Sequence, residues 1–206
     1  MTCVDSNRRP NDHCSAKPMS FDKITSEIRG FKIALLNVTS LTKHVDELKV
    51  FMANTPLDVL TINESKLDLV NGDRLVNLEG YNIVRRDRNK HGGGVWYYPR
   101  NAITFSRQHQ LENDDLELIA LEIQKANSCP FLIATWYRPP NTPLDYFKKF
   151  EMFLKEADAR YSEIYILGDL NCNILSNPPE IHTTHLLDLM VDYQLIGTIN
   201  QRTYKS

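Results

Sequence analysis

The 206-residue chain lacks the features that would place it in a membrane or in the secretory pathway. No uninterrupted apolar run is long enough to span a bilayer, and the N-terminus carries polar and charged residues where a signal peptide needs an apolar core. The formal net charge is only -2, so no global field draws the chain to nucleic acid or membrane, and any polyanion-binding surface must be local. These absences predict an intracellular protein without membrane contact, with the nucleus as one candidate compartment.

A cysteine framework is also absent. Cys3, Cys14, Cys129 and Cys172 include no pair at zinc-ligand spacing, and two of the four lie in the polar N-terminal segment. This distribution favours free thiols in a reducing compartment. The sequence has no internal repeat and no low-complexity segment either. With an ordinary hydrophobic content of 42%, the chain can bury one large core, so we predict a single domain, with or without a tail, and a monomer.

The N-terminal segment lacks the patterning of a folded element. Residues 1–30 are expected to be a disordered leader, and residues 31–206 to form the domain. The domain opens with a predicted strand, helix and strand at residues 33–38, 42–54 and 58–62. Thr42 is the predicted N-cap of the helix, and Pro56 ends it. A strand–helix–strand opening indicates a layered α/β fold.

The pattern changes after residue 64. Short strands joined by tight turns are predicted at residues 81–85, 95–98, 103–105, 116–123 and 131–137. Such hairpins imply an antiparallel or mixed sheet. Apolar residues at helical spacing mark a second helix at 147–154 and a third at 186–190, on either side of a strand that begins at Ile164. The chain is therefore predicted to form two packed sheets with helices outside.

The most informative stretch runs from Ile164 to Asn171. Its apolar part predicts a buried strand, which ends at Gly168 and is followed by Asp169 and Asn171 on either side of Leu170. Residues two apart in a strand point to the same face, so the two polar side chains are expected together at the mouth of a sheet. Taken alone, the stretch is a strand end that enters a turn, where Gly, Asp and Asn are common.

Two further strand ends carry oxygen donors, Asn37 and Glu64. A hard cation such as Mg²⁺ prefers oxygen ligands and needs few from the protein, because water and substrate phosphate supply the rest. Without partners, Glu64 would be an exposed loop carboxylate, and Asn37 would satisfy local backbone. The second alternative is weakened because an amide inside an apolar strand needs partners.

Two motifs could contact phosphate. In Tyr137-Arg138-Pro139-Pro140, the prolines force the chain out of the sheet and leave the tyrosine hydroxyl at the rim. The alternatives are an aromatic that packs on the prolines and an arginine in a surface ion pair. The second motif, residues 85–94, is a basic turn with three glycines that lacks the ending of a Walker loop. It would serve as a solvated hairpin turn or as a grip on a nucleic-acid backbone.

The order of these motifs resembles the endonuclease/exonuclease/phosphatase superfamily. More closely, it is similar to the apurinic-type endonuclease domain of non-LTR retrotransposons, which precedes a reverse transcriptase. The resemblance runs from about Phe31 to the last residues. It is carried by Asn37, Ile62-Asn63-Glu64-Ser65-Lys66-Leu67, Arg86-Asp87-Arg88 with Gly92-Gly93-Gly94-Val95, Tyr137-Arg138-Pro139-Pro140, and Gly168-Asp169-Leu170-Asn171.

The resemblance implies a four-layer α/β sandwich of two mixed sheets that cleaves DNA phosphodiesters at the sheets' rim. It assigns Glu64 as the metal-binding carboxylate, Asn37 as its neighbour, Tyr137 as a phosphate contact, Asp169 as the group that positions or deprotonates the attacking water, and Asn171 as the group that orients the water or the phosphate. The implied cofactor is Mg²⁺, with Mn²⁺ as the alternative. Implied partners are DNA, contacted by Arg86, Arg88 and Arg138, and a reverse-transcriptase domain of the same element.

The chain departs from the family at its end. Members finish with two further strands that carry an aspartate and a Ser-Asp-His-like ending, whereas this sequence stops at Ser206. We therefore expect a domain that is incomplete at the C-terminus, with activity reduced by about two to four orders of magnitude. His182 and His185 are expected on the surface near a helix start. Alternatives are a non-catalytic relic that at most binds metal or DNA, and a phosphatase or phosphodiesterase of the same superfamily.

Overall fold

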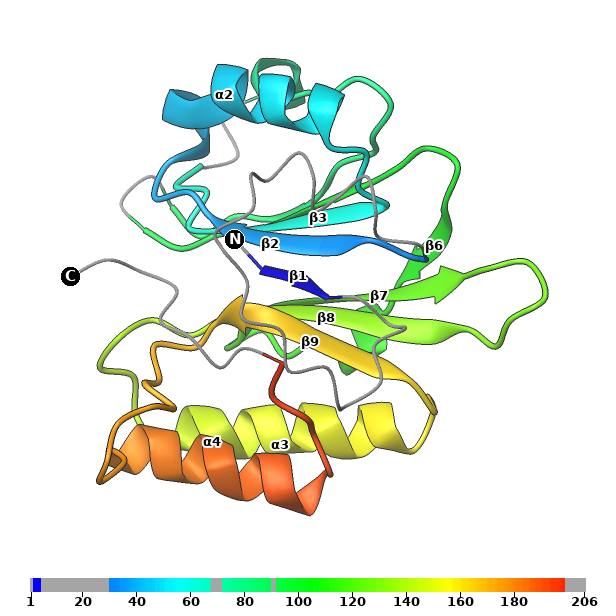
Figure 1. The fold of residues 1–206 in the computed structure, drawn as a ribbon. Coiled ribbons are helices and arrows are strands. Elements are labelled where there is room, and N and C mark those ends of the chain that lie inside the picture. The colour runs from blue at the N-terminus through cyan, green and yellow to red at the C-terminus, as the bar shows by residue number, and fades with distance from the viewer. Residues whose placement is uncertain (1, 5–29, 68–71, 90–91, 199–206) are drawn as a thin grey trace, which may run out of the picture.

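Two mixed β-sheets stack face to face, and helices cover their outer faces (Figure 1). The computed structural model describes residues 2–4, 30–67, 72–89 and 92–198. The first sheet has the order β1-β2-β3-β5-β4 and comprises β1 (Thr2–Val4), β2 (Ile33–Asn37), β3 (Val59–Asn63), β4 (Val84–Arg86) and β5 (Val95–Pro99). The second has the order β6-β7-β8-β9 and comprises β6 (Thr104–Arg107), β7 (Glu117–Gln124), β8 (Phe131–Tyr137) and β9 (Ile164–Asp169).

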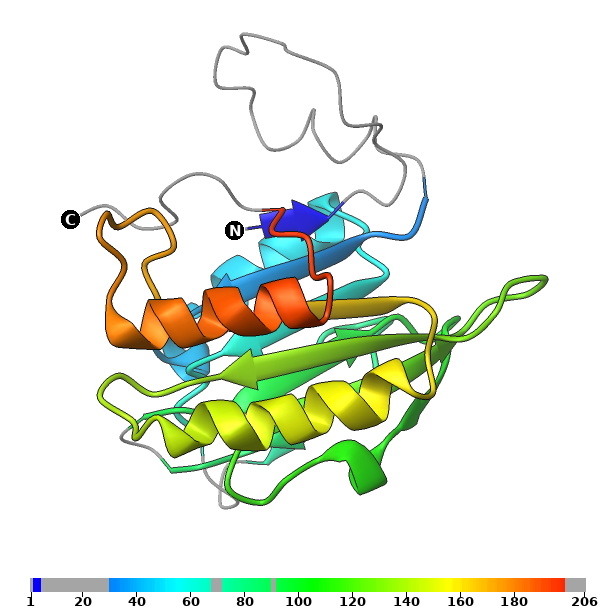
Figure 2. The same cartoon turned by 90° about the horizontal axis from the view of Figure 1, so that it is seen from below.

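The helices form the two outer layers. α2 (Leu41–Asn54) covers the first sheet, and α3 (Asp145–Asp158) and α4 (Ile181–Asp192) lie side by side across the second, as Figure 2 shows. The described residues also include two short 3-10 turns, η1 (Asp73–Leu75) and η2 (His109–Leu111). The arrangement is the predicted four-layer α/β sandwich. Within the described ranges, no helix combines the length and apolar character needed to cross a bilayer.

Each sheet contains one parallel pair of strands. β2 runs parallel to β3 and β8 runs parallel to β9, while the other pairs are antiparallel. A parallel pair needs a crossover connection, and α2 and α3 supply it. Both strands of such a pair end on the same side of their sheet. This topology is what gathers the polar residues at the strand ends.

Three apolar clusters hold the layers together. Between the sheets lie Ile33, Val59, Val95, Tyr97, Ile119, Leu121, Ile123, Phe131, Ile133, Tyr137 and Leu167. A second cluster fills the space under α2, and a third the space under α3 and α4. In α3, Phe147, Phe150 and Leu154 follow helical spacing and are buried, and Phe150 stacks on Trp136 at 4.0 Å between ring centroids.

Most predicted elements are present, and some details differ. The first helix begins at Leu41 with Ser40 at the N-cap position, so the prediction of Thr42 as N-cap is wrong. The strand predicted at residues 81–85 is shorter, because Tyr81 makes only an isolated bridge and β4 covers Val84–Arg86. In the segment expected to be a leader, residues 2–4 form β1 against β2, and residues 5–29 lie outside the described part of the chain.

Candidate active site

The ends of three strands bring Asn37, Glu64 and Asp169 into contact. The Nδ2 atom of Asn37 donates hydrogen bonds to Glu64 Oε1 at 2.9 Å and to Asp169 Oδ2 at 2.7 Å. Asn37 ends β2 and Glu64 follows β3, both in the first sheet, whereas Asp169 ends β9 in the second. A single amide therefore joins two carboxylates across the gap between the sheets.

The backbone at these strand ends is strained. Thr39, Glu64 and Asn171 adopt the left-handed region, with φ values of 54°, 57° and 47°. For a residue other than glycine this conformation costs about 1–2 kcal/mol, and asparagine tolerates it best. Strain of this kind gathers at functional sites, where the surrounding structure offsets it. Here it lets the chain turn sharply at the end of each strand.

Tyr137 occupies the middle of a polar row on the second sheet. Its register partners are Glu117 on β7 and Asp169 on β9, and residues paired in this way point to the same face. Burial, followed by the negative charges of Glu64 and Asp169, raises the pKa of Tyr137 to about 12. Like an ordinary tyrosine, Tyr137 is protonated at neutral pH and can donate a hydrogen bond, but the residue as a whole is buried, with 5% exposure, and also packs in the apolar layer between the sheets.

Asn171 lies next to Asp169, as the spacing predicts. Its backbone N–H donates to Asp169 Oδ1 at 3.1 Å, and its side-chain Nδ2 donates to the carbonyl of Arg138 at 2.8 Å. Asp169 is thus held from two sides, by this N–H and by the Asn37 amide. The contacts fix the direction of the carboxylate before any substrate arrives.

Arg138 is placed differently from a surface phosphate ligand. Its side chain is buried, with 2% exposure, and its guanidinium donates to the carbonyls of Leu170 and Asn171 and to the hydroxyl of Thr142. The alternative, a surface ion pair, does not fit either, because these hydrogen-bond partners are neutral oxygens inside the protein. The side chain contacts the loop that follows β9.

Arg88 and Glu117 border the site beside Tyr137. Arg88 Nη1 pairs with Glu117 Oε1 at 2.6 Å, and Glu117 Oε2 accepts the N–H of Gly94 at 2.9 Å. Gly93 has a φ of 72°, in the left-handed region that favours glycine, and a Cβ there would also displace the Glu117 carboxylate. Sequence reasoning missed Glu117. The signal is its register opposite Tyr137, and a single sequence does not supply register.

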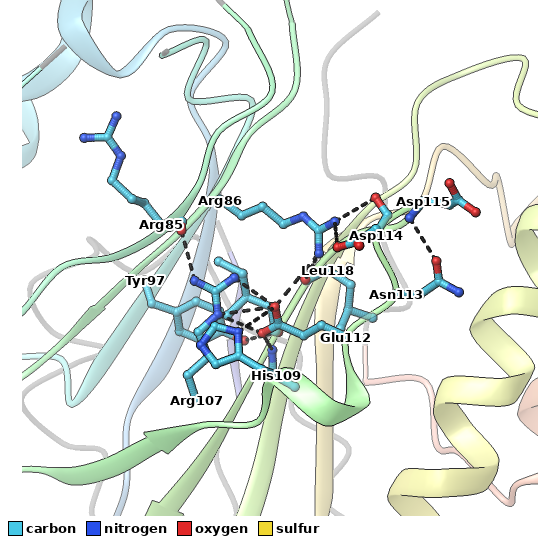
Figure 3. Close-up of polar contacts among 12 residues, drawn as sticks. Arg85, Arg86, Tyr97, Arg107, His109, Glu112, Asn113, Asp114, Asp115 and Leu118 are labelled. Carbon is cyan, nitrogen blue, oxygen red and sulfur yellow. Dashed lines mark hydrogen bonds and ion pairs between the residues drawn. The ribbon is translucent and has the colours of Figure 1, made fainter. Parts of the chain in front are cut away.

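Arg86 belongs to a polar network between the sheets (Figure 3). Its Nη2 donates to the carbonyl of Asp114 at 2.7 Å, while Arg107 forms a two-pronged pair with Glu112 at 2.9 and 2.8 Å. Arg107 also donates to the carbonyl of Arg85 at 3.1 Å, which ties β6 to β4. Of the three arginines predicted to contact DNA, Arg88 has the exposed side chain, at 38%, against 20% for Arg86.

The donor set suits a hard divalent cation. Glu64 and Asp169 place two carboxylates around one amide, and Mg²⁺ typically takes one or two protein carboxylates and fills its other positions with water and phosphate. In the described ranges, no group of three or more His, Cys, Asp or Glu side chains is arranged to hold a metal ion. Lys66 Nζ lies 3.8 Å from Glu64 Oε2 and offsets part of the negative charge.

The two histidines of α4 lie against α3. His182 bonds the carbonyl of Thr142 through Nε2 at 2.9 Å, and its ring centroid is 6.1 Å from that of Phe147. His185 is exposed and stacks on the same phenyl ring at 6.0 Å. Both stand in the first half of the helix, as the sequence predicts, but His182 is half-buried, so the expected surface position fits His185 alone of the two.

Comparison with known proteins identifies the family to which the chain belongs. The profile of the Endonuclease/Exonuclease/phosphatase family matches residues 25–204. The chain belongs to this family. Its members are hydrolytic nucleases and phosphatases that generally use divalent metal ions. A search of curated protein sequences found no match.

Solved structures of the family share the fold at low identity. The endonuclease domain of TRAS1, a telomere-specific non-LTR retrotransposon, is 12% identical with a TM-score of 0.62, and the match covers 80% of this chain and 71% of that one. The 3' phosphatase NExo from Neisseria, bound to a product DNA hairpin, is 17% identical with a TM-score of 0.61 over the same shares. The APE2 catalytic domain of Xenopus laevis is 15% identical, with a TM-score of 0.54 over 76% and 66%.

Proposed function

We propose that this chain is a Mg²⁺-dependent DNA endonuclease of the non-LTR retrotransposon type, which hydrolyses phosphodiester bonds. The observation that carries the proposal is the bridge from Asn37 to Glu64 and Asp169, with the protonated Tyr137 hydroxyl beside it. The donor set suits a cation, and the phenol suits a phosphate oxygen. Mn²⁺ is the alternative ion.

Each residue of the site has its own role in the proposed hydrolysis. Glu64 would hold the cation, with Asn37 beside it, and a bound cation neutralises phosphate charge and stabilises the leaving oxygen. Asp169 takes the proton of the attacking water, and its direction is held by the Asn37 amide and the Asn171 N–H. Tyr137 keeps its proton and donates a hydrogen bond from its hydroxyl to a non-bridging phosphate oxygen. Asn171 keeps the carboxylate aligned and orients the water or the phosphate.

Two motifs favour the retrotransposon branch. Tyr137-Arg138-Pro139-Pro140 ends β8, and the triple-glycine turn precedes β5. The fold is shared about equally with the TRAS1 endonuclease domain and with the 3' phosphatase NExo, so the choice of branch rests on the two motifs. On this proposal the partner is DNA, with Arg88 as the exposed basic contact beside Tyr137. A reverse-transcriptase domain of the same element and a nuclear site of action follow from it.

The test is nicking of supercoiled plasmid with Mg²⁺ and with a chelator. We expect Glu64→Gln and Asp169→Asn to lower the rate by roughly 10²- to 10⁴-fold, because each removes a charge from the site and keeps its shape. Glu156→Gln and Asp188→Asn, exposed carboxylates on α3 and α4, are the matched controls. Equal nicking by Glu64→Gln and wild type would contradict the proposal.

The same preparation separates the alternatives. Release of phosphate from an inositol phosphate, without plasmid nicking, would assign the chain to the phosphatase branch. Binding of labelled duplex DNA without turnover, at Mg²⁺ concentrations that saturate the site, would assign it as a non-catalytic domain. Nicking with all controls intact supports the endonuclease.

A further inference from the structure

We propose that Arg138 is a positioning residue, which acts through the loop that carries Asp169 and Asn171. The inference rests on the proposed function, since it concerns the groups that would activate water. Arg138 itself stays away from the substrate, because its side chain is only 2% exposed.

The guanidinium holds the loop by its carbonyls. Nε donates to the carbonyl of Leu170 at 2.6 Å, and Nη2 donates to the carbonyl of Asn171 at 2.7 Å. Nη1 donates to Thr142 Oγ1 at 2.8 Å, which anchors the group to the segment before α3. The planar guanidinium thus connects two adjacent carbonyls of the loop to the hydroxyl of Thr142, which lies outside the loop.

The backbone of Arg138 adds two contacts to the same loop. Its N–H donates to the carbonyl of Asp169 at 3.0 Å, and its carbonyl accepts the Asn171 side-chain amide at 2.8 Å. Three consecutive residues, Asp169 to Asn171, are therefore bonded to one residue. Asn171 has a φ of 47°, a conformation that needs such external support.

Only arginine suits this position. Its described hydrogen-bond partners are neutral oxygens and the Cys172 thiol, and its guanidinium lies 5.5 Å from the centroid of the Phe147 ring. A buried charge is tolerated when its donors are satisfied, and a planar fork with five N–H groups can satisfy several carbonyls at once. A lysine ammonium is shorter and tetrahedral, and it would leave a buried carbonyl without a donor.

Substitution should therefore damage turnover more than binding. We expect Arg138→Lys to lower kcat by roughly 10²-fold, because a displacement of about 1 Å of a catalytic group costs that much. KM for the plasmid should stay within about twofold, since interactions made only in the transition state affect kcat and not KM. Arg160→Lys, an exposed arginine just after α3, is the matched control and should leave both constants unchanged.

A readout without turnover tests the position of the loop directly. Amide hydrogen exchange of peptides that cover residues 168–172 should quicken in Arg138→Lys, while peptides from β7 keep their wild-type exchange. A general loss of structure would instead quicken exchange in β7 as well. Unchanged exchange at 168–172 would overturn the inference, whether or not the protein nicks DNA.

A second test of the role of Arg138 is chemical rescue with free guanidinium. In Arg138→Ala, added guanidinium chloride at sub-denaturing concentration should restore slow exchange at residues 168–172 and raise kcat, whereas equal ammonium chloride should not. Failure of guanidinium to act where Arg138→Ala is folded would overturn the inference. If wild-type protein does not nick plasmid, the proposed function fails, and the exchange measurements still decide the role of Arg138.

Discussion

At the scale of single residues, the site trades stability for geometry. Glu64 sits at φ 57° with its carboxylate bonded to Asn37, and Lys66, two residues on, is left-handed as well, at 52°. A glycine would adopt this backbone without steric cost. On the proposed function, the need for a metal-binding carboxylate would account for glutamate at this position, where glycine would adopt the backbone at lower cost.

This strain predicts a difference between two substitutions at one position. Glu64→Gly should be more stable to urea than Glu64→Ala by about 1 kcal/mol, because only the alanine keeps a Cβ in the left-handed region. At Glu156, inside α3, the order should reverse by a similar amount, since glycine is the poorer helix residue there. Both Glu64 variants should lose plasmid nicking. Equal free energies of unfolding for the two Glu64 variants would show that the turn carries no strain.

At the scale of elements, Tyr97 links the two sheets. It lies on β5, and its hydroxyl reaches the carbonyl of Ile119 on β7 at 3.2 Å and that of Ile133 on β8 at 3.0 Å. The side chain is fully buried in the apolar layer between the sheets. Burial raises the pKa of this phenol far above its ordinary value. The folded protein therefore holds the proton more tightly than the unfolded chain does.

The raised pKa predicts an alkaline loss of stability. Tyr97 stabilises the fold fully below the unfolded pKa of about 10, and that contribution falls as pH rises above it. Urea unfolding measured from neutral pH to about pH 11 should show a steeper decline for wild type than for Tyr97→Phe, which cannot ionise there. At neutral pH the phenylalanine variant should be less stable by about 1 kcal/mol, for want of the inter-sheet hydrogen bond. If the free energies of unfolding of wild type and Tyr97→Phe fell in parallel as pH rises, Tyr97 would be excluded as the titrating group.

At the scale of the whole molecule, hydrogen bonds of the candidate site also connect the two sheets. Asn37 and Glu64 come from the first sheet and Asp169 from the second. The same two sheets are joined by the Arg107 contact to the carbonyl of Arg85 and by the Asn63 contact to the carbonyl of Trp136. A cation held by Glu64, as proposed, would bind the folded state and so stabilise this contact between the sheets.

This geometry predicts stabilisation by Mg²⁺. At a concentration about a hundred times its Kd, the ion should raise Tm by roughly 5 to 10 °C, because it binds the folded chain and not the unfolded one. Glu64→Gln should lose most of the shift, and Asp169→Asn, which removes a neighbouring negative charge, should lose part of it, while Glu156→Gln keeps it. Differential scanning fluorimetry with and without chelator measures this. A shift that survives both site substitutions would place the ion elsewhere.

The sequence predicted elements and candidate residues well where local pattern decides them. β8 was predicted at residues 131–137 and occupies Phe131–Tyr137, because a run of apolar residues bounded by prolines is a local signal. Thr42 failed as an N-cap because Ser40, equally compatible with the pattern, is the N-cap and the helix begins at Leu41, two residues earlier than a Thr42 cap would allow. The roles of Asn37, Glu64, Tyr137, Asp169 and Asn171 came from motif order and stay predictions.

The amino-acid sequence by itself determined which strands end in oxygen donors, because strand length and turn chemistry are local properties. Only the tertiary structure decided which of those donors meet. The contact between Asn37 and Asp169 spans 132 residues and depends on how two sheets stack. The same long-range packing buried Arg138 against the loop after β9 and set Glu117 opposite Tyr137. Register and burial arise from the packing of distant segments, and no local pattern encodes them.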